Sequence, residues 1–155
     1  MTINEGARIP AVELAAPDGR RIALGDFAGK PLVLYFYPKD DTAGCTREAQ
    51  DFSAALADFR DAGAQILGIS RDTPAKHGRF IEKYDLSVQL ASDETGAAME
   101  AFGVWIEKSL YGRKYMGIDR STFLFDRSGQ LVRSWRKVRV PGHVAAVLEA
   151  VKGLA

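Results

Sequence analysis

Six consecutive apolar residues stand between two prolines near the start of the sequence, and this stretch constrains the fold more than any other. The run over residues 32–37 is short, continuous and rich in aromatic side chains, which indicates a β-strand buried on both faces. Pro38 cannot donate to a strand ladder and would end it. After a charged turn, apolar residues recur at steps of three and four, the spacing of an amphipathic helix: Ala49, Phe52, Leu56 and Phe59. The sequence therefore predicts a buried strand that leads into a helix.

The only cysteine of the chain, Cys45, falls in the first turn of this predicted helix, which Thr42 can cap. The first amide N–H groups of a helix have no intrahelical partner and the macrodipole is positive there, so this position favours a thiolate. Free cysteines are also commonly buried as small hydrophobes. Because the neighbours Gly44, Thr46 and Arg47 do not form an apolar stripe, the local sequence favours a reactive thiol over a buried one.

Two separated motifs resemble the active-site sequences of the peroxiredoxin family. Pro38, Thr42 and Cys45 have the spacing of the peroxiredoxin active-site loop, in which the cysteine is the peroxidatic residue. The segment YPKDDTAGCTREAQDF around them resembles the Q-type branch, the bacterioferritin comigratory proteins. Much further along, WIEKSLYGRKYMGIDRSTFLFD begins at Trp105 and is similar to the second signature of that branch, with Arg120 at the position of its catalytic arginine. The resemblance covers nearly the whole chain.

The resemblance implies a thiol-dependent peroxidase that reduces hydrogen peroxide and organic hydroperoxides. The Cys45 thiolate would attack one peroxide oxygen and become a sulfenic acid. Arg120 would hold the thiolate and donate hydrogen bonds to the peroxide, and Thr42 would bond both. Pro38 would pack over the sulfur, and the backbone amide of Gly44 would complete the substrate-binding pocket.

Each of these residues also has a structural interpretation. Thr42 can be a helix cap, Pro38 a strand terminator, and Arg120 a surface ion-pair partner of Asp119. Glu48 lies one helical turn beyond the cysteine, where it helps to hold the arginine in the family, but it can equally be a solvated carboxylate. The joint occurrence of the motif residues favours the catalytic interpretation.

The sequence departs from the common Q-type pattern at two positions. Many relatives carry a resolving cysteine five residues after the first, where this chain has Gln50, and Ala43 replaces the usual proline. With one cysteine, the implied mechanism needs an external thiol such as a thioredoxin, a glutaredoxin or glutathione. A disulfide between Cys45 residues of two chains would require the first helical turn to open.

The rest of the sequence alternates between short apolar segments and amphipathic ones. Residues 11–24 predict a hairpin around the turn Pro17-Asp18-Gly19, and Gly63 can end the helix that follows Thr42. Further strands are predicted at 65–70, 88–91, 115–118, 122–125 and 131–135, and further helices at 74–84, 94–102 and 140–151. This order predicts an α/β class, a thioredoxin-like fold with a mixed central sheet flanked by helices and an N-terminal β-hairpin. Residues 1–155 are expected to form a single peroxiredoxin domain of the AhpC/TSA type.

Composition excludes several classes of function. With 21 basic and 20 acidic residues, the net charge of +1 gives no reason to expect nucleic acid or a membrane surface as a partner. The segment MTINEGARIP lacks the pattern of a secretory signal, and a free thiol suits a reducing compartment, so a cytoplasmic protein is expected. Without a Cys/His cluster or a glycine-rich phosphate loop, neither metal nor cofactor is expected. A monomer or weak dimer is the expected assembly.

Three competing hypotheses remain open at this point. A thiol–disulfide oxidoreductase would want a C-x-x-C pair, but position 48 is a glutamate. A cysteine hydrolase could use His77 or His143 as its base, although both histidines are expected to be exposed. A thioredoxin-fold redox sensor or interaction module would use Cys45 sulfenylation as a signal rather than for turnover.

Overall fold

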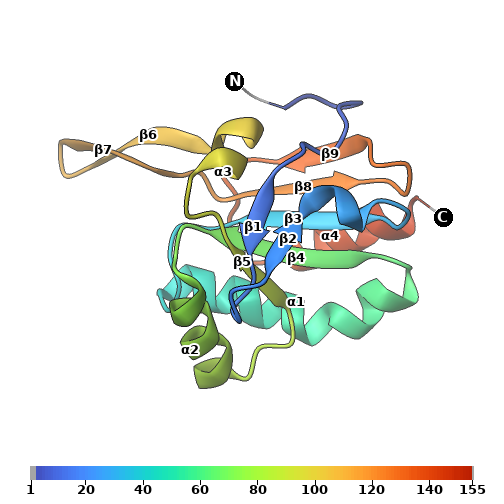
Figure 1. Cartoon of the computed structure of the whole chain (residues 1–155), viewed down its shortest axis with the longest axis horizontal. Coiled ribbons are helices and arrows are strands. Elements are labelled where there is room, and N and C mark those ends of the chain that lie inside the picture. The colour runs from blue at the N-terminus through green and yellow to red at the C-terminus, as the bar shows by residue number, and fades with distance from the viewer. Residues whose placement is uncertain (1–2, 155) are drawn as a thin grey trace.

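The predicted buried strand lies in the middle of a seven-stranded sheet (Figure 1). The computed structural model describes residues 3–154, and in it β3 (Leu32–Phe36) is buried at every position. It pairs in parallel with β4 (Gln65–Ser70) and antiparallel with β8 (Ser121–Phe125). Because both faces of β3 are covered, its side chains are apolar without alternation. The prediction of a strand buried on both faces is confirmed.

The strand order of the sheet is β2-β1-β5-β4-β3-β8-β9. Its remaining strands are β1 (Glu13–Ala15), β2 (Arg21–Ala23), β5 (Gln89–Ser92) and β9 (Leu131–Trp135). β5 continues the parallel part beside β4, whereas β9 and the N-terminal β1–β2 hairpin add antiparallel edges. The sheet is therefore mixed, as the sequence predicts.

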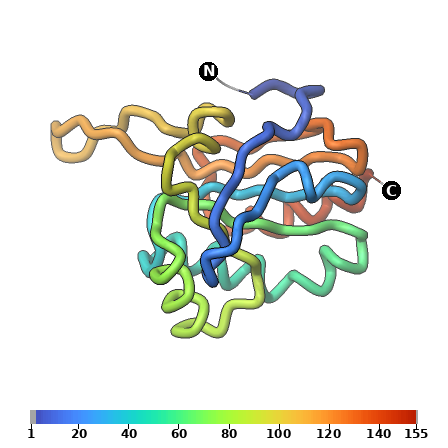
Figure 2. The backbone as a smooth tube through the Cα atoms, in the orientation of Figure 1, coloured from blue at the N-terminus to red at the C-terminus, as the bar shows by residue number. Residues whose placement is uncertain are grey.

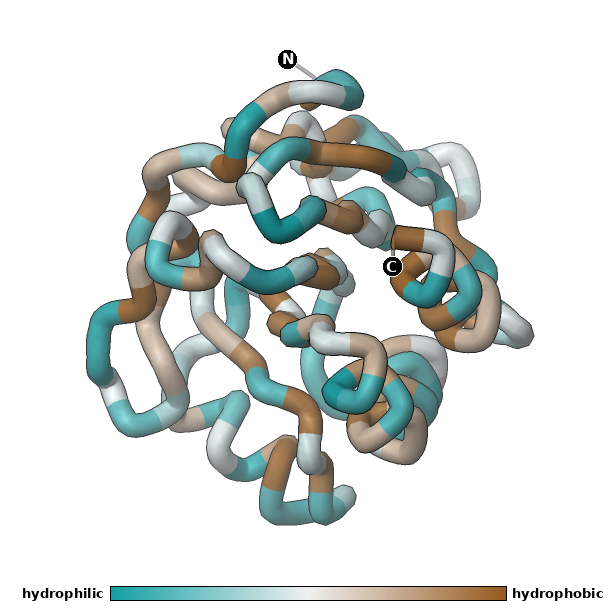
Figure 3. Tube along the Cα trace, turned by 90° about the vertical axis from the view of Figure 1, so that its right-hand side faces the viewer, coloured by the Kyte–Doolittle hydropathy of each residue, from teal (hydrophilic) through white to brown (hydrophobic). Residues whose placement is uncertain are grey.

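Helices cover both faces of this sheet. One face is covered by α1 (Ala43–Asp61), α2 (Pro74–Tyr84) and α4 (His143–Lys152), which pack on the side chains of Val33, Tyr35 and Tyr37. The other face is covered by η1 (Leu24–Phe27) and α3 (Ala97–Phe102), which pack on Leu32, Leu34 and Phe36. In the trace coloured by hydropathy, the outer loops are mostly hydrophilic (Figure 3). The alternation along β3 thus divides the core into two clusters.

Several parts of the chain differ from the sequence-based expectation; among them, α4 begins at His143, three residues later than predicted. The strand predicted at 115–118 is longer, β7 (Arg113–Ile118), and pairs with an unpredicted strand, β6 (Trp105–Leu110), in a separate two-stranded sheet. This hairpin projects from the body of the molecule (Figures 1 and 2). Helix α3 begins three residues later than predicted, because the Asp93 carboxylate accepts the amides of Ala98 and Met99 and so fixes the start of the helix. Among the described residues, no helix combines the length and apolarity that a membrane crossing requires.

Candidate active site

The loop between β3 and α1 and the first two turns of α1 carry most of the residues that the sequence singles out. Pro38 lies two residues after the end of β3 and is half-buried, and Thr42 occupies the N-cap position of α1. The Thr42 side chain makes no capping bond; its hydroxyl donates instead to the carbonyl oxygen of Lys39 at 2.8 Å. The capping interpretation of this hydroxyl is therefore wrong, and the same bond closes the loop on itself.

Cys45 is the third residue of α1, in the first turn as predicted. It is not open to solvent, however, because only 1% of its surface is exposed. It belongs to the buried cluster that also contains Tyr35, Tyr37, Ala49 and Phe52. The expectation that this turn avoids apolar surroundings is wrong, because α1 lays its first turn on the face of β3 from which the two tyrosines project.

Arg120 reaches the sulfur from a distant part of the sequence. Its Nη2 donates to Cys45 Sγ at 3.3 Å, and its Nη1 donates to Glu48 Oε1 at 2.7 Å. The pairing of Phe36 with Ser121 explains this approach, because it places the residue before β8 beside the end of β3. The alternative pairing with Asp119 is not formed; that carboxylate accepts the amide of Lys137 instead.

Burial controls the electrostatics of this group of residues. Removal from water raises the pKa of Glu48 to about 7, although the neighbouring Arg120 acts in the opposite direction. Burial also disfavours the charge of Arg120, but the charges of Glu48 and Cys45 outweigh it and raise the pKa of Arg120. Since Glu48 is fully buried, its interpretation as a solvated carboxylate is wrong.

Gly44 leaves room for the guanidinium. A Cβ atom at this position would lie 3.1 Å from Nη2 of Arg120, closer than an ordinary van der Waals contact. The amide N–H groups at the start of α1 have no acceptor one turn earlier in the helix. The absence of a side chain at Gly44 therefore lets the guanidinium lie beside the first turn of α1, where these amides are.

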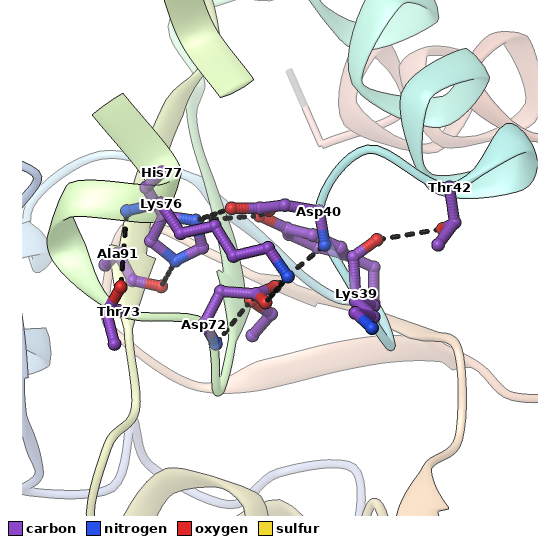
Figure 4. Close-up of polar contacts among 10 residues, drawn as sticks. Lys39, Asp40, Thr42, Asp72, Thr73, Lys76, His77 and Ala91 are labelled. Carbon is purple, nitrogen blue, oxygen red and sulfur yellow. Dashed lines mark hydrogen bonds and ion pairs between the residues drawn. The ribbon is translucent and has the colours of Figure 1, made fainter. Parts of the chain in front are cut away.

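A buried network anchors the loop on its other side (Figure 4). The Asp40 carboxylate contacts His77 Nδ1 at 2.6 Å and accepts the hydroxyl of Tyr37, and both Asp40 and His77 are buried. His77 Nε2 lies 3.1 Å from the carbonyl oxygen of Ala91, which can only accept, so this nitrogen carries a proton. The backbone amide of Asp40 donates to Asp72 at 2.8 Å. The expectation that His77 is exposed is wrong.

Ionic contacts with α2 extend this network at the surface. Asp41 accepts Lys83 Nζ at 2.8 Å and also the hydroxyl of Tyr84, while Lys76 Nζ lies 2.9 Å from Asp72. Helix α2 therefore holds two successive residues of the active-site loop.

Three groups in the network have the chemistry of metal ligands. Asp40, Asp72 and His77 offer ligand atoms within 4.8 Å of one another. Those atoms already have hydrogen-bond partners, and the Lys76 ammonium compensates the charge of Asp72. We therefore assign the cluster to holding the loop. Sequence reasoning missed it because its members come from two segments more than 30 residues apart, and only the Asp40 position lies in a motif.

His143, at the start of α4, is also buried, contrary to expectation. Its Nε2 lies 2.8 Å from Thr122 Oγ1, and its ring makes T-shaped contacts with Phe52 and Trp135. Burial lowers the pKa of His143 to about 4, with a smaller contribution from the charge of Arg120. Neither histidine hydrogen-bonds Cys45 in the described part of the chain, so the arrangement of a cysteine hydrolase is not formed.

A guanidinium held against a sulfur at a helix terminus suits a thiol peroxidase, and comparisons with known proteins agree. The model of the AhpC/TSA family matches residues 6–134. Peroxiredoxin Bcp of Bacillus subtilis is 46% identical over 155 residues, covering 100% of this chain and 99% of that protein. Peroxiredoxin Bcp of Xanthomonas campestris is 49% identical over 142 residues, covering 92% and 89%. A solved structure of the Xanthomonas campestris bacterioferritin comigratory protein has a TM-score of 0.89 at 45% identity, covering 97% and 98%.

The chain belongs to the AhpC/TSA family, within its peroxiredoxin Q or Bcp branch. The predictions of the family and of a thioredoxin-like α/β fold are thereby confirmed. The protein is a thiol-dependent peroxidase, an oxidoreductase that acts on peroxides with thiol reductants. Its single cysteine fits the predicted one-cysteine mechanism.

Proposed function

We propose that Cys45 is the peroxidatic residue and that Arg120 is the group that keeps it reactive. The observation that carries the proposal is the 3.3 Å contact between Arg120 Nη2 and Cys45 Sγ, made while Nη1 of the same guanidinium is held by Glu48. A cation fixed at this distance stabilises negative charge on sulfur before the reaction and on oxygen during it. Glu48 acts as a positioning residue, because it touches the arginine and not the sulfur.

The proposed reaction begins when the Cys45 thiolate attacks one oxygen of the peroxide. An S–O bond forms and the O–O bond breaks, so that sulfur is oxidised to a sulfenic acid while the second oxygen leaves as hydroxide or alkoxide and takes up a proton. Arg120 and the amides at Gly44 and Cys45 stabilise the charge that develops on the leaving oxygen. One reductant thiol then forms a mixed disulfide with Cys45 and releases water, and a second thiol attacks the reductant sulfur of this disulfide, so that Cys45 leaves as a thiolate and the reductant is oxidised to a disulfide.

Thr42 and Pro38 receive supporting roles. The Thr42 hydroxyl donates its one hydrogen bond to the backbone carbonyl of Lys39. The lone pairs of the hydroxyl oxygen therefore remain free to accept a hydrogen bond from a protonated peroxide oxygen. We therefore assign Thr42 to orienting the peroxide as an acceptor, rather than to donating to the thiolate. Pro38, half-buried at the end of β3, has no N–H to compete for the substrate and limits the access of water.

The proposed substrates are hydrogen peroxide and organic hydroperoxides. A solved relative, the Xanthomonas campestris bacterioferritin comigratory protein, is described by its alkyl peroxide reduction activity, which supports the second class. The reductant is an external thiol such as a thioredoxin, a glutaredoxin or glutathione. We further propose a cytoplasmic location, because a free catalytic thiol needs a reducing compartment. The proposed assembly is a monomer or weak dimer. Strands from both ends of the described chain join one sheet, which supports the prediction of a single domain over residues 1–155.

The test compares peroxide turnover by the parent, Cys45→Ser and Arg120→Gln, with each of the three thiols as reductant. We expect Cys45→Ser to be inactive and Arg120→Gln to lose roughly 10²–10³ in kcat/KM for peroxide, the usual cost of removing one charge-stabilising donor. Peroxide reduction by the serine variant at the parent rate would overturn the assignment. Consumption of a single peroxide equivalent per chain, with no turnover under any thiol, would instead support a redox sensor.

A further inference from the structure

The projecting β6–β7 hairpin carries most of the exposed apolar side chains of the molecule. Five large hydrophobic residues are exposed in the described part of the chain, and four of them lie in this hairpin: Leu110, Tyr111, Tyr115 and Met116. The hairpin extends from the end of the molecule at which α1 begins (Figures 1 and 2). Exposed apolar groups gathered on one projecting element are typical of an interaction surface.

The strand register assigns these side chains to two opposite faces. Lys108 pairs with Tyr115 and Leu110 with Arg113, whereas Glu107 pairs with Met116 and Ser109 with Lys114. Because successive side chains of a strand point to opposite faces, these pairs alternate along the hairpin. One face, here named the Lys108 face, consists of Ile106, Lys108, Leu110, Arg113 and Tyr115. The opposite Met116 face consists of Glu107, Ser109, Lys114 and Met116.

The Lys108 face adjoins the active site. The stem of Lys108 leans toward the base of the hairpin, since a Cβ atom on Gly117 would lie 3.3 Å from Lys108 Cδ. Two residues beyond Gly117 the chain reaches Asp119, followed by Arg120. Burial lowers the pKa of Lys108. The charge of Arg120 lowers it further, whereas the charges of Asp119 and Cys45 act in the opposite direction. The Lys108 side chain therefore points toward the end of the hairpin that leads into Arg120, the residue that contacts Cys45.

The two faces also differ in charge. On the Met116 face, Lys114 Nζ lies 3.7 Å from Glu107, so the two charges compensate each other. On the Lys108 face, neither Lys108 nor Arg113 forms an ion pair within residues 3–154. The Lys108 face thus combines apolar side chains with two uncompensated cations, which is complementary to an apolar surface with acidic groups.

The chemistry of the active site requires an external thiol to reach Cys45. Cys45 is the only cysteine of the chain and is 1% exposed, so its sulfenic acid must meet a thiol brought from outside. A face of five residues is small beside the about 20–30 residues per side of a standard stable interface, and small interfaces are usual in transient redox encounters. A second copy of this chain is a poor partner for this face, because the cations of the two Lys108 faces would repel each other. We propose that the Lys108 face is the docking surface for an acidic protein dithiol that reduces Cys45, an inference that rests on the proposed function.

The docked reaction is a thiol exchange in two steps. One partner thiolate attacks the sulfur of the Cys45 sulfenic acid, so that an S–S bond forms, the S–O bond breaks and the hydroxyl leaves as water after taking a proton. The second partner thiol then attacks the partner's own sulfur in this mixed disulfide. Cys45 leaves as a thiolate, and the partner is oxidised to a disulfide.

The experiment compares neighbouring residues that point to opposite faces of the same hairpin. Tyr115→Ser and Arg113→Glu change the Lys108 face, and Met116→Ser and Lys114→Glu are the matched controls. Tyr115 and Met116 are 47% and 51% exposed, so both changes remove similar amounts of apolar surface from solvent contact. Each variant is assayed for peroxide turnover with thioredoxin, with glutaredoxin and with dithiothreitol, which needs no docking surface.

We expect the two Lys108-face variants to lose roughly fivefold or more in kcat/KM for the protein reductant, the effect of changing an interface residue that contributes to binding without being a hot spot. Their turnover with dithiothreitol, and all rates of the two control variants, should remain at the parent level. Equal losses on both faces, or an equal loss with dithiothreitol, would overturn the docking surface. Parent turnover with dithiothreitol but with neither protein would show that the reductant is not a protein dithiol. Absence of turnover with every thiol would overturn the proposed function itself.

Discussion

The Arg120 guanidinium connects two buried groups, Glu48 and Cys45, whose negative charges would each be costly to bury without a cation nearby. Glu48 is fully buried, and its Oε2 finds no hydrogen-bond partner among the described residues. A carboxylate without a partner in such a place costs several kcal/mol, which is why its pKa is raised to about 7. The arginine offsets part of that cost and at the same time presents its second nitrogen to Cys45. The position of the guanidinium therefore depends on Glu48 and on the space left by Gly44.

The first prediction separates the position of the guanidinium from its presence. In Gly44→Ala the new Cβ would lie 3.1 Å from Nη2 of Arg120, so the guanidinium must move by a few tenths of an ångström. Because small displacements of catalytic groups are costly, we expect kcat/KM for peroxide to fall on the order of 10-fold. Stability should be kept or increased, since alanine is favoured over glycine in a helix by up to about 1 kcal/mol.

Gly78→Ala provides the matched control for this prediction. Gly78 lies in α2, and a Cβ atom there would meet nothing within 4 Å. This variant should gain stability in urea unfolding and keep the parent rate of peroxide reduction. Unchanged activity in Gly44→Ala would contradict the idea that the open space at Gly44 serves Arg120.

The second prediction concerns the pH dependence of stability and follows from the raised pKa of Glu48. Between the ordinary pKa of a glutamate, 4.5, and the raised pKa of about 7, the folded protein retains a proton on Glu48 that the unfolded chain has already released. The free energy of unfolding of the parent should therefore fall as the pH rises through this range, relative to Glu48→Gln, which does not titrate there. Urea unfolding of both proteins from pH 4.5 to 7.5 measures the difference. Glu82→Gln, on the exposed side of α2, tests whether loss of any carboxylate has the same effect.

At the scale of elements, α2 acts as the support of the active-site loop. The buried pair of Asp40 and His77 joins the loop to the inner side of this helix, and the exposed pair of Asp41 and Lys83 joins it at the outer side. The loop in turn determines where the first turn of α1 and its cysteine lie. A helix with no catalytic residue of its own can thus affect the geometry of the reaction.

The third prediction is a double-mutant cycle on the buried pair. His77→Leu alone leaves the Asp40 carboxylate buried without its nitrogen partner, and we expect a loss of about 3–5 kcal/mol in the free energy of unfolding. The double variant Asp40→Ala, His77→Leu should lose clearly less than the sum of the two single variants. The exposed pair, replaced in the same way by Asp41→Ala and Lys83→Leu, should show a coupling below about 1 kcal/mol. Additive effects at the buried pair would contradict its role.

The elements that the sequence predicts well are those with local signals. β3 is a continuous apolar run, β4 was predicted with the bounds it has, and α2 begins at Pro74 after Thr73, whose hydroxyl accepts the amide of Lys76. β6 escapes prediction because it pairs only with β7 and none of its six side chains is buried, so no apolar pattern marks it. Apolar patterns in the sequence arise from burial in the core, and the projecting β6–β7 hairpin has few buried side chains to produce one.

The site shows the same division between local and distant information. The motif spacing identified Cys45 and Arg120, but the burial of Cys45, His77 and His143 depends on how α1, α2 and α4 pack on one sheet face. A histidine in an amphipathic helix has no local feature that distinguishes a buried position from an exposed one. Its partner Asp40 lies 37 residues earlier in the chain, beyond the reach of any periodicity.

At the scale of the whole molecule, the chain has one sulfur nucleophile and no second thiol to protect it. The sheet brings Arg120 to Cys45 across 75 residues, and the helices that cover it bury the cysteine almost completely. A reductant with an exposed thiol needs the first turn of α1 to open in one chain, whereas a disulfide between two copies needs it to open in both chains at once. Oxidation without a reductant should therefore continue on the same sulfur rather than end in a disulfide.

The last prediction follows from this isolation. With excess peroxide and no thiol, the sulfenic acid of Cys45 cannot be resolved within the chain and should advance to the sulfinic acid, a mass gain of about 32 Da. Intact-mass spectrometry should show this product together with loss of turnover that dithiothreitol does not restore, and a non-reducing gel should show monomers. Cys45→Ser under the same treatment corrects for oxidation of the methionines, of which Met116 is exposed. A disulfide-linked dimer as the main product would mean that the first turn of α1 opens faster than a second peroxide reacts, and that the buried position of Cys45 does not govern its fate.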